Sequence, residues 1–380
     1  MKKKGKGKNK QKGKMSALVK VMLAINIIVV AMYILSAFCG HINPNTMGYV
    51  SAFSMAYPVM FVLLLFTFLF WIFTHRMFLL ISLVALVATV SQIMTFFPLH
   101  FNNYDEVKTS DRFTLMSYNA KHMSITDDEN RIVGVIEDIL EYNPDFVCLQ
   151  EGQTYVKMNQ RGINEDLLAR MKARYPYDYA SNFMNICGFL SKKPVSLVLS
   201  EGDDGYFNLE VFKTEALKGT AYILNTHLES IGLTDSDKEL YLKLTDKKVE
   251  NSSLRGVRSR LLSKLIVAAK KRSHQAERIR AVADSLSIAD PKAKIFICGD
   301  FNDPPYTYSY LTIKGDMSDA MKDAGLGYSN TYHDSRFYFR IDHIFYDPGK
   351  CRPVCTFVAK TESSDHYPVI SVFENKLTNK

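Results

Sequence analysis

The feature that most constrains this chain is the distribution of charge along its N-terminal part. Residues 15–104 contain no Asp or Glu, and their only full charges are Lys20 and Arg76. The uncharged stretches among them are Val21–Phe38, Met47–Phe73 and Met77–Phe97. Each is long enough to cross a hydrocarbon core about 30 Å thick. Buried core helices or a cleaved signal peptide are the alternatives, but three such stretches in succession favour membrane spans.

The same distribution divides the chain into segments. Residues 1–14 hold eight Lys and no acid, whereas residues after 111 have the composition of an ordinary soluble domain. The predicted segments are a basic cytoplasmic tail at 1–14, three transmembrane helices at about 17–39, 47–73 and 77–97 within 15–97, a linker at 98–111, and a C-terminal domain at 112–380.

The placement of Lys and Arg predicts an orientation in the membrane. The Lys-rich tail is expected to stay in the cytoplasm, because basic segments are retained there. The loop Gly40–Thr46 has no Lys or Arg and is expected outside, and the loop Thr74–Arg76 carries a basic residue and is expected inside. The third span would then deliver the domain to the outer side. The sequence thus predicts a multi-pass integral membrane protein with a cytoplasmic N-terminus and its C-terminal domain on the extracytoplasmic side.

The net charge of the C-terminal domain limits the partners that it can bind. The chain carries +8, of which the eight tail lysines with Lys20 and Arg76 contribute +10, so residues 105–380 carry −2. A nearly neutral domain argues against a broad nucleic-acid surface.

None of the six Cys forms a C-x-x-C pair typical of zinc sites. Cys351 and Cys355 are four residues apart, and the sequence leaves open whether they form a disulfide.

Beyond the linker, short apolar runs alternate with helical patterns. In Glu129–Tyr142, residues such as Ile132, Val135 and Ile139 recur at helical spacing. Further helices are predicted at Asn164–Tyr175 and Leu254–Ile288. The predicted strands are Arg112–Asn119, Asp145–Gln150, Gly188–Ser191, Val195–Ser200, Phe207–Lys213, Thr220–Thr226, Lys294–Cys298, Arg340–Tyr346, Val354–Val358 and Tyr367–Phe373. Many strands with fewer helices predict an α/β domain of two packed sheets flanked by helices.

Polar residues recur where these apolar strands end, at positions where rigid elements present functional groups. The set is Asn119, Glu151, His227, Asp300, Asn302, Asp342, Asp365 and His366. Carboxylate and amide oxygens are ligands suited to Mg²⁺, and imidazoles transfer protons or donate hydrogen bonds. Taken singly, each has an ordinary structural explanation such as a turn, a cap or a satisfied buried histidine. Taken together and in order, they predict a site.

Six motifs make the pattern more specific, and together they resemble the endonuclease/exonuclease/phosphatase superfamily. The motifs are Ser117-Tyr118-Asn119, Leu149-Gln150-Glu151, Asn225-Thr226-His227-Leu228, Gly299-Asp300-Phe301-Asn302-Asp303, Arg340-Ile341-Asp342-His343-Ile344 and Ser364-Asp365-His366. Members include pancreatic-type deoxyribonuclease, abasic-site endonucleases, inositol-polyphosphate phosphatases and neutral sphingomyelinases. The resemblance covers about residues 112–374. It implies a four-layer α/β sandwich of two mixed β-sheets flanked by helices, here preceded by the three transmembrane helices.

The resemblance also implies roles for the metal-side residues. Glu151 would be the principal carboxylate on Mg²⁺, for which Mn²⁺ is the alternative. Asn119 would lie beside it, and Asp365 would be a second carboxylate on the metal side. Asp300 would orient and deprotonate the attacking water, and Asn302 would hydrogen-bond the phosphoryl group.

The two histidines receive roles from the same resemblance. Asp342 would pair with His366 and favour its charged form, so that His366 can bind a phosphate oxygen. His227 would stabilise the phosphate or protonate the leaving group. The basic segment 232–272 lies outside these motifs. It is interpreted as a surface for an anionic bilayer, as a gate over the site, or as a solvated helix packed on its own domain.

Three functions remain open from the sequence. The first is a membrane-anchored, Mg²⁺-dependent phosphoesterase that hydrolyses a phosphodiester or a phosphomonoester, with a lipid headgroup as the substrate that its tether favours. The second is an extracytoplasmic nuclease, against which the near-neutral domain argues. The third is a catalytically inactive membrane scaffold, against which the retention of every polar site position argues. The expected partners are thus a phosphate-ester substrate, lipid or nucleic acid, and the bilayer.

The predicted orientation is testable in intact cells that express the full chain. A protease added outside should cleave the domain after residue 111, because the third span would deliver it to the outer surface. The measurement is loss of the full-length band on a blot. Cleavage only after permeabilisation would contradict the predicted topology.

Overall fold

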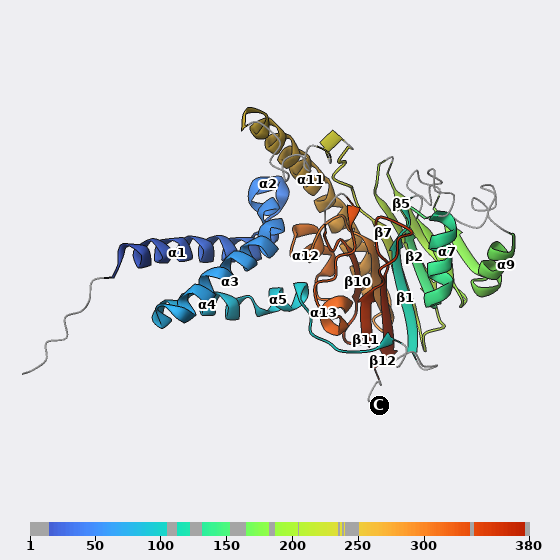
Figure 1. The fold of residues 1–380 in the computed structure, drawn as a ribbon. Helices are drawn as coiled ribbons and strands as arrows, with labels where there is room; N and C mark the ends of the chain where they lie inside the picture. Colours follow the sequence, from blue (N-terminus) through green and yellow to red (C-terminus); the bar gives the residue numbers. More distant parts are fainter. Residues whose placement is uncertain are drawn as a thin grey trace, which may run out of the picture.

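The computed structural model describes residues 15–104, 112–121, 131–152, 165–181, 187–203, 205–234, 236–237, 239, 251–334 and 338–376, with the backbone alone for 131–132, 251–255, 257 and 258. In Figure 1 the apolar N-terminal helices project to one side of a domain built from two β-sheets and their covering helices. The sequence pattern of an apolar unit followed by an α/β domain is therefore seen directly in the architecture.

Each sheet has six strands. The first has the order β11-β12-β1-β2-β4-β3 and the second the order β5-β6-β7-β8-β10-β9. The first contains β1 (Arg112–Asn119), β2 (Phe146–Gln150), β3 (Tyr177–Ala180), β4 (Gly188–Ser191), β11 (Cys351–Val358) and β12 (Val369–Asn375). The second contains β5 (Ser196–Gly202), β6 (Asn208–Thr214), β7 (Ala221–His227), β8 (Lys294–Asp300), β9 (Ser318–Asp319) and β10 (Asp342–Tyr346). Parallel β1–β2 and β7–β8 pairs among antiparallel neighbours make both sheets mixed.

The domain has four layers. The covering helices are α7 (Arg131–Tyr142), α9 (Glu165–Arg174), α11 (Asn251–Ala289), α12 (Tyr308–Lys314) and α13 (Ala320–Ala324). One apolar cluster joins α7 and α9 to the outer face of the first sheet, and another joins α11 and α12 to the outer face of the second. A third cluster lies between the sheets, where Phe113 packs edge-on against Phe296 with ring centroids 5.6 Å apart. The predicted four-layer sandwich is confirmed.

Strand pairing decides where the polar strand ends lie. In the parallel pair β7–β8, His227 is opposite Asp300, and in the antiparallel pair β8–β10, Asp300 is opposite Asp342. In the parallel pair β1–β2, Asn119 is opposite Gln150, directly before Glu151. Because parallel strands end at the same edge, these groups gather at one edge of the sandwich.

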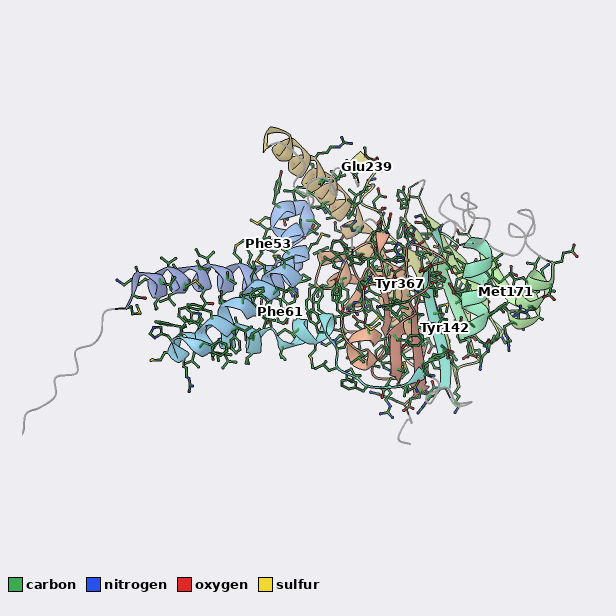
Figure 2. The ribbon with its side chains drawn as sticks, viewed as in Figure 1. Phe53, Phe61, Tyr142, Met171, Glu239 and Tyr367 are labelled. Carbon is green, nitrogen blue, oxygen red and sulfur yellow. The ribbon has the colours of Figure 1, made fainter. Side chains whose placement is uncertain are left out.

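The N-terminal helices are α1 (Ala17–Phe38), η1 (Cys39–His41), α2 (Pro44–Ala52), η2 (Phe53–Ala56), α3 (Tyr57–Phe73), α4 (Arg76–Ala88) and α5 (Val90–Phe96). Their projecting side chains are nearly all carbon (Figure 2). Two described helical segments, Ala17–His41 and Pro44–Phe73, are long and apolar enough to cross a membrane. The pair Arg76–Ala88 and Val90–Phe96 is bent by 66°, which makes a third if the pair is one span.

The bend in the third stretch differs from the continuous helix predicted at about 77–97. Thr89 lies at the break, and its hydroxyl donates to the carbonyl of Ala85 at 2.9 Å. A threonine that bonds back to the preceding turn favours bending of a helix. The bend directs α5 toward the catalytic domain, where Lys322 on α13 donates to Ser91 at 2.9 Å.

The structure also bears on the predicted linker, the predicted strands and the basic segment. The segment predicted as a linker is ordered in its described part, 98–104: Leu99 forms a β-bridge with Leu326, and the His100 amide donates to the carbonyl of Gly325 at 2.9 Å. The short strands β3 and β9 were not predicted, because two to four residues carry little periodicity. In the basic segment, Lys264 pairs with Asp237 at 2.5 Å, so part of its charge is satisfied within the domain.

The disulfide left open by the sequence is not formed, since Cys351 and Cys355 are buried free thiols. Both lie on β11, where four residues span roughly 13 Å of extended chain. Disulfides join Cα atoms only about 4.4–6.8 Å apart. Their thiols instead donate to the carbonyls of Asp347 and Asn102.

The inter-sheet core provides a stability prediction. The buried rings of Phe189 and Phe212 stack with centroids 4.0 Å apart, one from each sheet. Phe212→Ala is expected to lower the free energy of unfolding by about 3–5 kcal/mol, because it leaves a cavity between the sheets. Urea unfolding of the full chain in detergent, followed by circular dichroism, measures the change. Val198→Ala on β5, where the side chain is 48% exposed, is the control; equal effects of the two would contradict the packing argument.

Candidate active site

The first part of the site comes from the ends of β1 and β2. Asn119 is buried, and its amide donates to Asp300 Oδ2 at 2.9 Å and reaches Glu151 Oε1 at 3.5 Å. Its own Oδ1 accepts the backbone N–H of Lys121 at 3.0 Å. Glu151 follows β2 with a positive φ of 49°, an uncommon conformation for a non-glycine residue. Asn119 therefore connects two carboxylates that arise from different sheets.

The second part comes from β7 and β8. His227 Nε2 lies 3.6 Å from Asp300 Oδ2 and 3.7 Å from Glu151 Oε1. Asn302 adopts a positive φ of 52°, and its backbone N–H donates to Asp300 Oδ1 at 2.8 Å. Its side-chain amide donates to the carbonyl of Leu228 at 3.0 Å and lies 3.3 Å from His227 Nε2. The turn after β8 thus holds Asp300 and Asn302 against the histidine.

The third part is the pair of Asp342 and His366. Asp342 Oδ2 lies 2.9 Å from His366 Nδ1, and His366 Nε2 lies 3.8 Å from Asp300 Oδ2. All three side chains are buried. The backbone N–H of Asp342 donates to Thr331 Oγ1 at 3.1 Å, which anchors the start of β10. The imidazole therefore lies between two carboxylates.

Burial and neighbouring charge shift two pKa values here. Burial, and then the charge of Asp342, raise the pKa of Asp300 to about 6, although His366 and His227 oppose them. Burial disfavours the imidazolium of His366, but the carboxylates of Asp342 and Asp300 outweigh it and raise the pKa of His366 to about 10. Near neutral pH, Asp300 is therefore a carboxylate of raised basicity and His366 a cation.

Asp365 occupies a different position from the other predicted residues. Its carboxylate forms an ion pair with Lys121 at 2.9 Å. The neighbouring Ser364 donates to the carbonyl of Asn119 at 2.8 Å, which ties this loop to the end of β1. The contacts above bring together Asn119, Glu151, His227, Asp300, Asn302, Asp342 and His366. Asp365 lies at the side of this group, where Lys121 balances its charge.

Sequence reasoning did not single out Thr331 or Lys121. Thr331 accepts hydrogen bonds from the backbone of both Ile341 and Asp342, but it lies in a loop without a motif. Its role depends on that loop folding back over β10. Lys121 follows the first motif by two residues, and only the folded chain brings it to Asp365. No local signal in the sequence distinguishes either residue.

The donor set fits a divalent cation at Glu151. Glu151 Oε1 and Asp300 Oδ2 approach the same two nitrogen atoms, on Asn119 and His227, so two carboxylate oxygens converge on one space. Such oxygens suit Mg²⁺ or Mn²⁺. A second group, Asp300, Asp342 and His366, has potential ligand atoms within 4.8 Å of one another. In this second group, His366 Nδ1 is already paired with Asp342 Oδ2 at 2.9 Å.

A two-sheet sandwich with acid, amide and imidazole groups converging at one edge defines a class of metal-dependent phosphoesterases. A sequence model of the Endonuclease/Exonuclease/phosphatase family matches residues 116–366, more than half of the chain. The chain belongs to this family, and the protein is a metal-dependent hydrolase of phosphate esters. A second family model, a domain of unknown function (DUF8431), matches residues 19–96. No curated protein sequence matches the chain.

Solved structures with a similar fold are distant in sequence. Truncated TDP2 from Caenorhabditis elegans aligns with a TM-score of 0.49 and 16% identity, over 69% of this chain and 98% of that one. The human Nocturnin catalytic domain with bound sulfate gives 0.48 and 17%, over 71% and 97%. An endonuclease/exonuclease/phosphatase from Bacteroides vulgatus gives 0.45 and 17%, over 71% and 100%. At these identities the likeness concerns the fold alone.

The shifted pKa values predict a pH dependence. Activity should rise as Asp300 loses its proton around pH 6 and fall as His366 loses its proton around pH 10. Asp342→Asn removes the largest of the carboxylate charges that favour the imidazolium, so the basic limb should move to lower pH. The measurement is kcat/KM against pH at saturating metal. A basic limb that stays in place in the variant would show that His366 does not depend on Asp342.

Proposed function

We propose that this protein is a membrane-anchored, Mg²⁺-dependent phosphodiesterase that attacks a phosphate ester with water, and that its substrate is a lipid headgroup in the membrane that holds it. The observation that carries the catalytic part is the convergence of six polar side chains around Asp300, which brings together residues from both sheets. The apolar helices that lie beside the domain support the choice of substrate, because a tether raises the local concentration of membrane substrates.

Glu151 would hold the metal as its principal carboxylate ligand, with Asn119 beside it and Asp365 as a further carboxylate on that side. When bound, the ion would polarise a nonbridging phosphate oxygen and offset the charge that develops on the leaving oxygen. The amide of Asn119 meanwhile donates to Asp300, so it aligns the base with the metal side of the site.

Asp300 is the proposed general base. A carboxylate with a pKa of about 6 is a stronger base than an exposed one and is still ionised at neutral pH. Its Oδ1 is occupied by the backbone N–H of Asn302, and its Oδ2 is shared by Asn119 and the two histidines. These contacts orient the carboxylate for a water molecule, and Asn302 would hydrogen-bond the phosphoryl group through the amide N–H that it does not donate to the carbonyl of Leu228.

The histidines would contact the phosphate itself. His366 is a cation at neutral pH and is held by Asp342, so its Nε2–H can bind a phosphate oxygen as negative charge moves during the reaction. His227 lies opposite, within reach of Glu151, Asp300 and Asn302. It would stabilise the phosphate or protonate the leaving group.

A nuclease acting outside the cytoplasm is the second candidate. The shared phosphodiester chemistry of the site supports it equally, but the charge of −2 on residues 105–380 does not favour binding of a polyanion. A phosphomonoester substrate is chemically compatible with the same residues. The preference for a membrane lipid therefore depends on the N-terminal helices rather than on the catalytic groups.

Substrate class and metal dependence are tested together on the purified full chain in detergent. The substrates are plasmid DNA, sphingomyelin, phosphatidylinositol phosphates and a bis-aryl phosphodiester, each with Mg²⁺ or with EDTA. Turnover of a lipid that EDTA abolishes is expected. Activity confined to DNA would remove the lipid proposal, and activity that survives chelation would remove the metal mechanism.

Two substitutions test the roles proposed for Asp300 and Glu151. Asp300→Ala is expected to reduce kcat by about 10²–10⁴-fold, because it removes the general base. Glu151→Gln should instead raise the Mg²⁺ concentration needed for half-maximal activity, because it removes a charged ligand. Glu141→Gln, an exposed position on α7, is the matched control and should behave as the wild type. An unchanged metal requirement in Glu151→Gln would contradict its role as the principal ligand.

A further inference from the structure

The loop that follows β8 carries catalytic groups and then runs to the N-terminal helices. Asp300 and Asn302 lie at its start, and Tyr306 lies near its end, before α12. Both Asn302 and Tyr306 have positive φ, 52° and 65°. Asn tolerates this conformation, but for a bulky residue such as Tyr it is an unfavourable outlier. Contacts from elsewhere must therefore hold Tyr306 in place.

The N-terminal helices supply those contacts. The hydroxyl of Tyr306 lies 3.2 Å from Ser91 Oγ and 3.3 Å from Thr95 Oγ1, both on α5. At the backbone, Gly40 in η1 packs so closely on the carbonyl of Tyr306 that a Cβ at position 40 would overlap its oxygen atom. Tyr306 is thus held at its ring end by α5 and at its backbone by η1.

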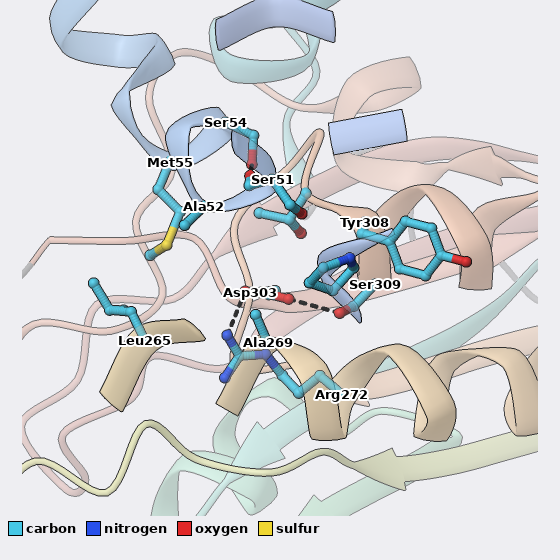
Figure 3. Close-up of a pocket in the computed structure, with 12 residues that line it drawn as sticks. Ser51, Ala52, Ser54, Met55, Leu265, Ala269, Arg272, Asp303, Tyr308 and Ser309 are labelled. Carbon is cyan, nitrogen blue, oxygen red and sulfur yellow. Dashed lines mark hydrogen bonds and ion pairs between the residues drawn. The ribbon is translucent and has the colours of Figure 1, made fainter. Parts of the chain in front are cut away.

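A second link joins the same loop to the interface with the helices. Asp303 directly follows Asn302, and its buried carboxylate accepts from Arg272 Nη2 at 2.8 Å and from Ser309 Oγ at 2.7 Å (Figure 3). Its backbone carbonyl accepts from His343 Nε2 at 2.9 Å. Figure 3 also shows Ser51 of α2 and Met55 of η2 across a cavity of about 10 Å³ from this ion pair.

Polar contacts join α2 and its N-cap residue Asn43 to α11 and α12. Asn45 donates to Ser273 Oγ on α11 at 2.8 Å, and Asn43 donates to the hydroxyl of Tyr308 on α12 at 3.1 Å. Gly48 lies against the side chain of Ile266 on α11. The N-terminal helices and the catalytic domain therefore meet around the loop that positions Asp300 and Asn302.

We propose that the N-terminal helices position the active site as well as anchor it: η1 and α5 hold Tyr306 and thereby keep the loop 300–307 in its catalytic conformation. Tyr306 is a positioning residue, because it acts through Asn302 and Asp300 and not on the substrate. Displacing the helices is expected to lower kcat more than it changes KM, since the misplaced groups act in the transition state. This inference rests on the proposed function for its kinetic readout.

A pair of glycine substitutions in the full chain, reconstituted in phosphatidylcholine vesicles, tests the proposal. Gly40→Ala places a methyl group against the backbone of Tyr306 and should reduce kcat for a bis-aryl phosphodiester with Mg²⁺ by about 10–100-fold, with little change in KM. Gly48→Ala is the matched control. Its Cβ would meet the γ2 methyl of Ile266 at 2.7 Å, a side-chain atom on α11 away from the loop 300–307, so kcat should stay near the wild-type value.

Tyr306→Phe provides a variant without a steric clash. It removes the hydroxyl that meets Ser91 and Thr95, and a smaller loss of kcat at unchanged KM is expected. Wild-type kcat in both Gly40→Ala and Tyr306→Phe would overturn the proposal, as would an equal loss in Gly48→Ala.

Amide hydrogen exchange separates this inference from the proposed function. Residues 300–307 should exchange faster in Gly40→Ala than in Gly48→Ala, whatever substrate the enzyme uses. Unchanged exchange would overturn the positioning role. Faster exchange together with a wild-type chain that is inactive on every phosphodiester would overturn the proposed function alone.

Discussion

The buried carboxylate of Asp300 is the interaction centre on which the rest of the site depends. Burying a carboxylate without partners is costly, and here the cost is offset by the amide of Asn119, the backbone N–H of Asn302 and the nearby imidazoles. The compensation is incomplete, so the pKa of Asp300 stays raised at about 6. This balance leaves a group that is ionised near neutral pH and still basic enough to accept a proton.

Both sheets contribute residues to the group around Asp300. Asp300, His227 and Asp342 come from neighbouring strands of one sheet, whereas Asn119 and Glu151 come from the other. The aromatic layer between the sheets sets their separation, because close-packed rings resist compression and sliding. The distances between these polar groups therefore depend on the inter-sheet core as much as on the loops.

The N-terminal helices lie outside the sandwich and next to the site. They contact α11, α12 and the loop after β8, so the apolar unit and the site share a boundary. The conformation of Tyr306 is unfavourable for an isolated loop and persists because the surrounding contacts over-determine it. Under the proposed function, one strained residue would connect anchoring with catalysis.

The sequence by itself determined the division into an apolar unit and an α/β domain, because charge and periodicity are local properties. Through six short motifs in family order it also pointed to the polar residues that the fold brings together, apart from Asp365, which pairs with Lys121. It did not indicate the break at Thr89, the ion pair of Lys121 with Asp365, the anchoring by Thr331, or the closeness of Gly40 to Tyr306. Tertiary structure alone decided these, because each depends on bringing together residues that lie far apart in the chain or on how a helix packs. The pairing of β7 with β8 and of β1 with β2 carried the polar strand ends to one edge, and no local pattern encodes which strands become neighbours.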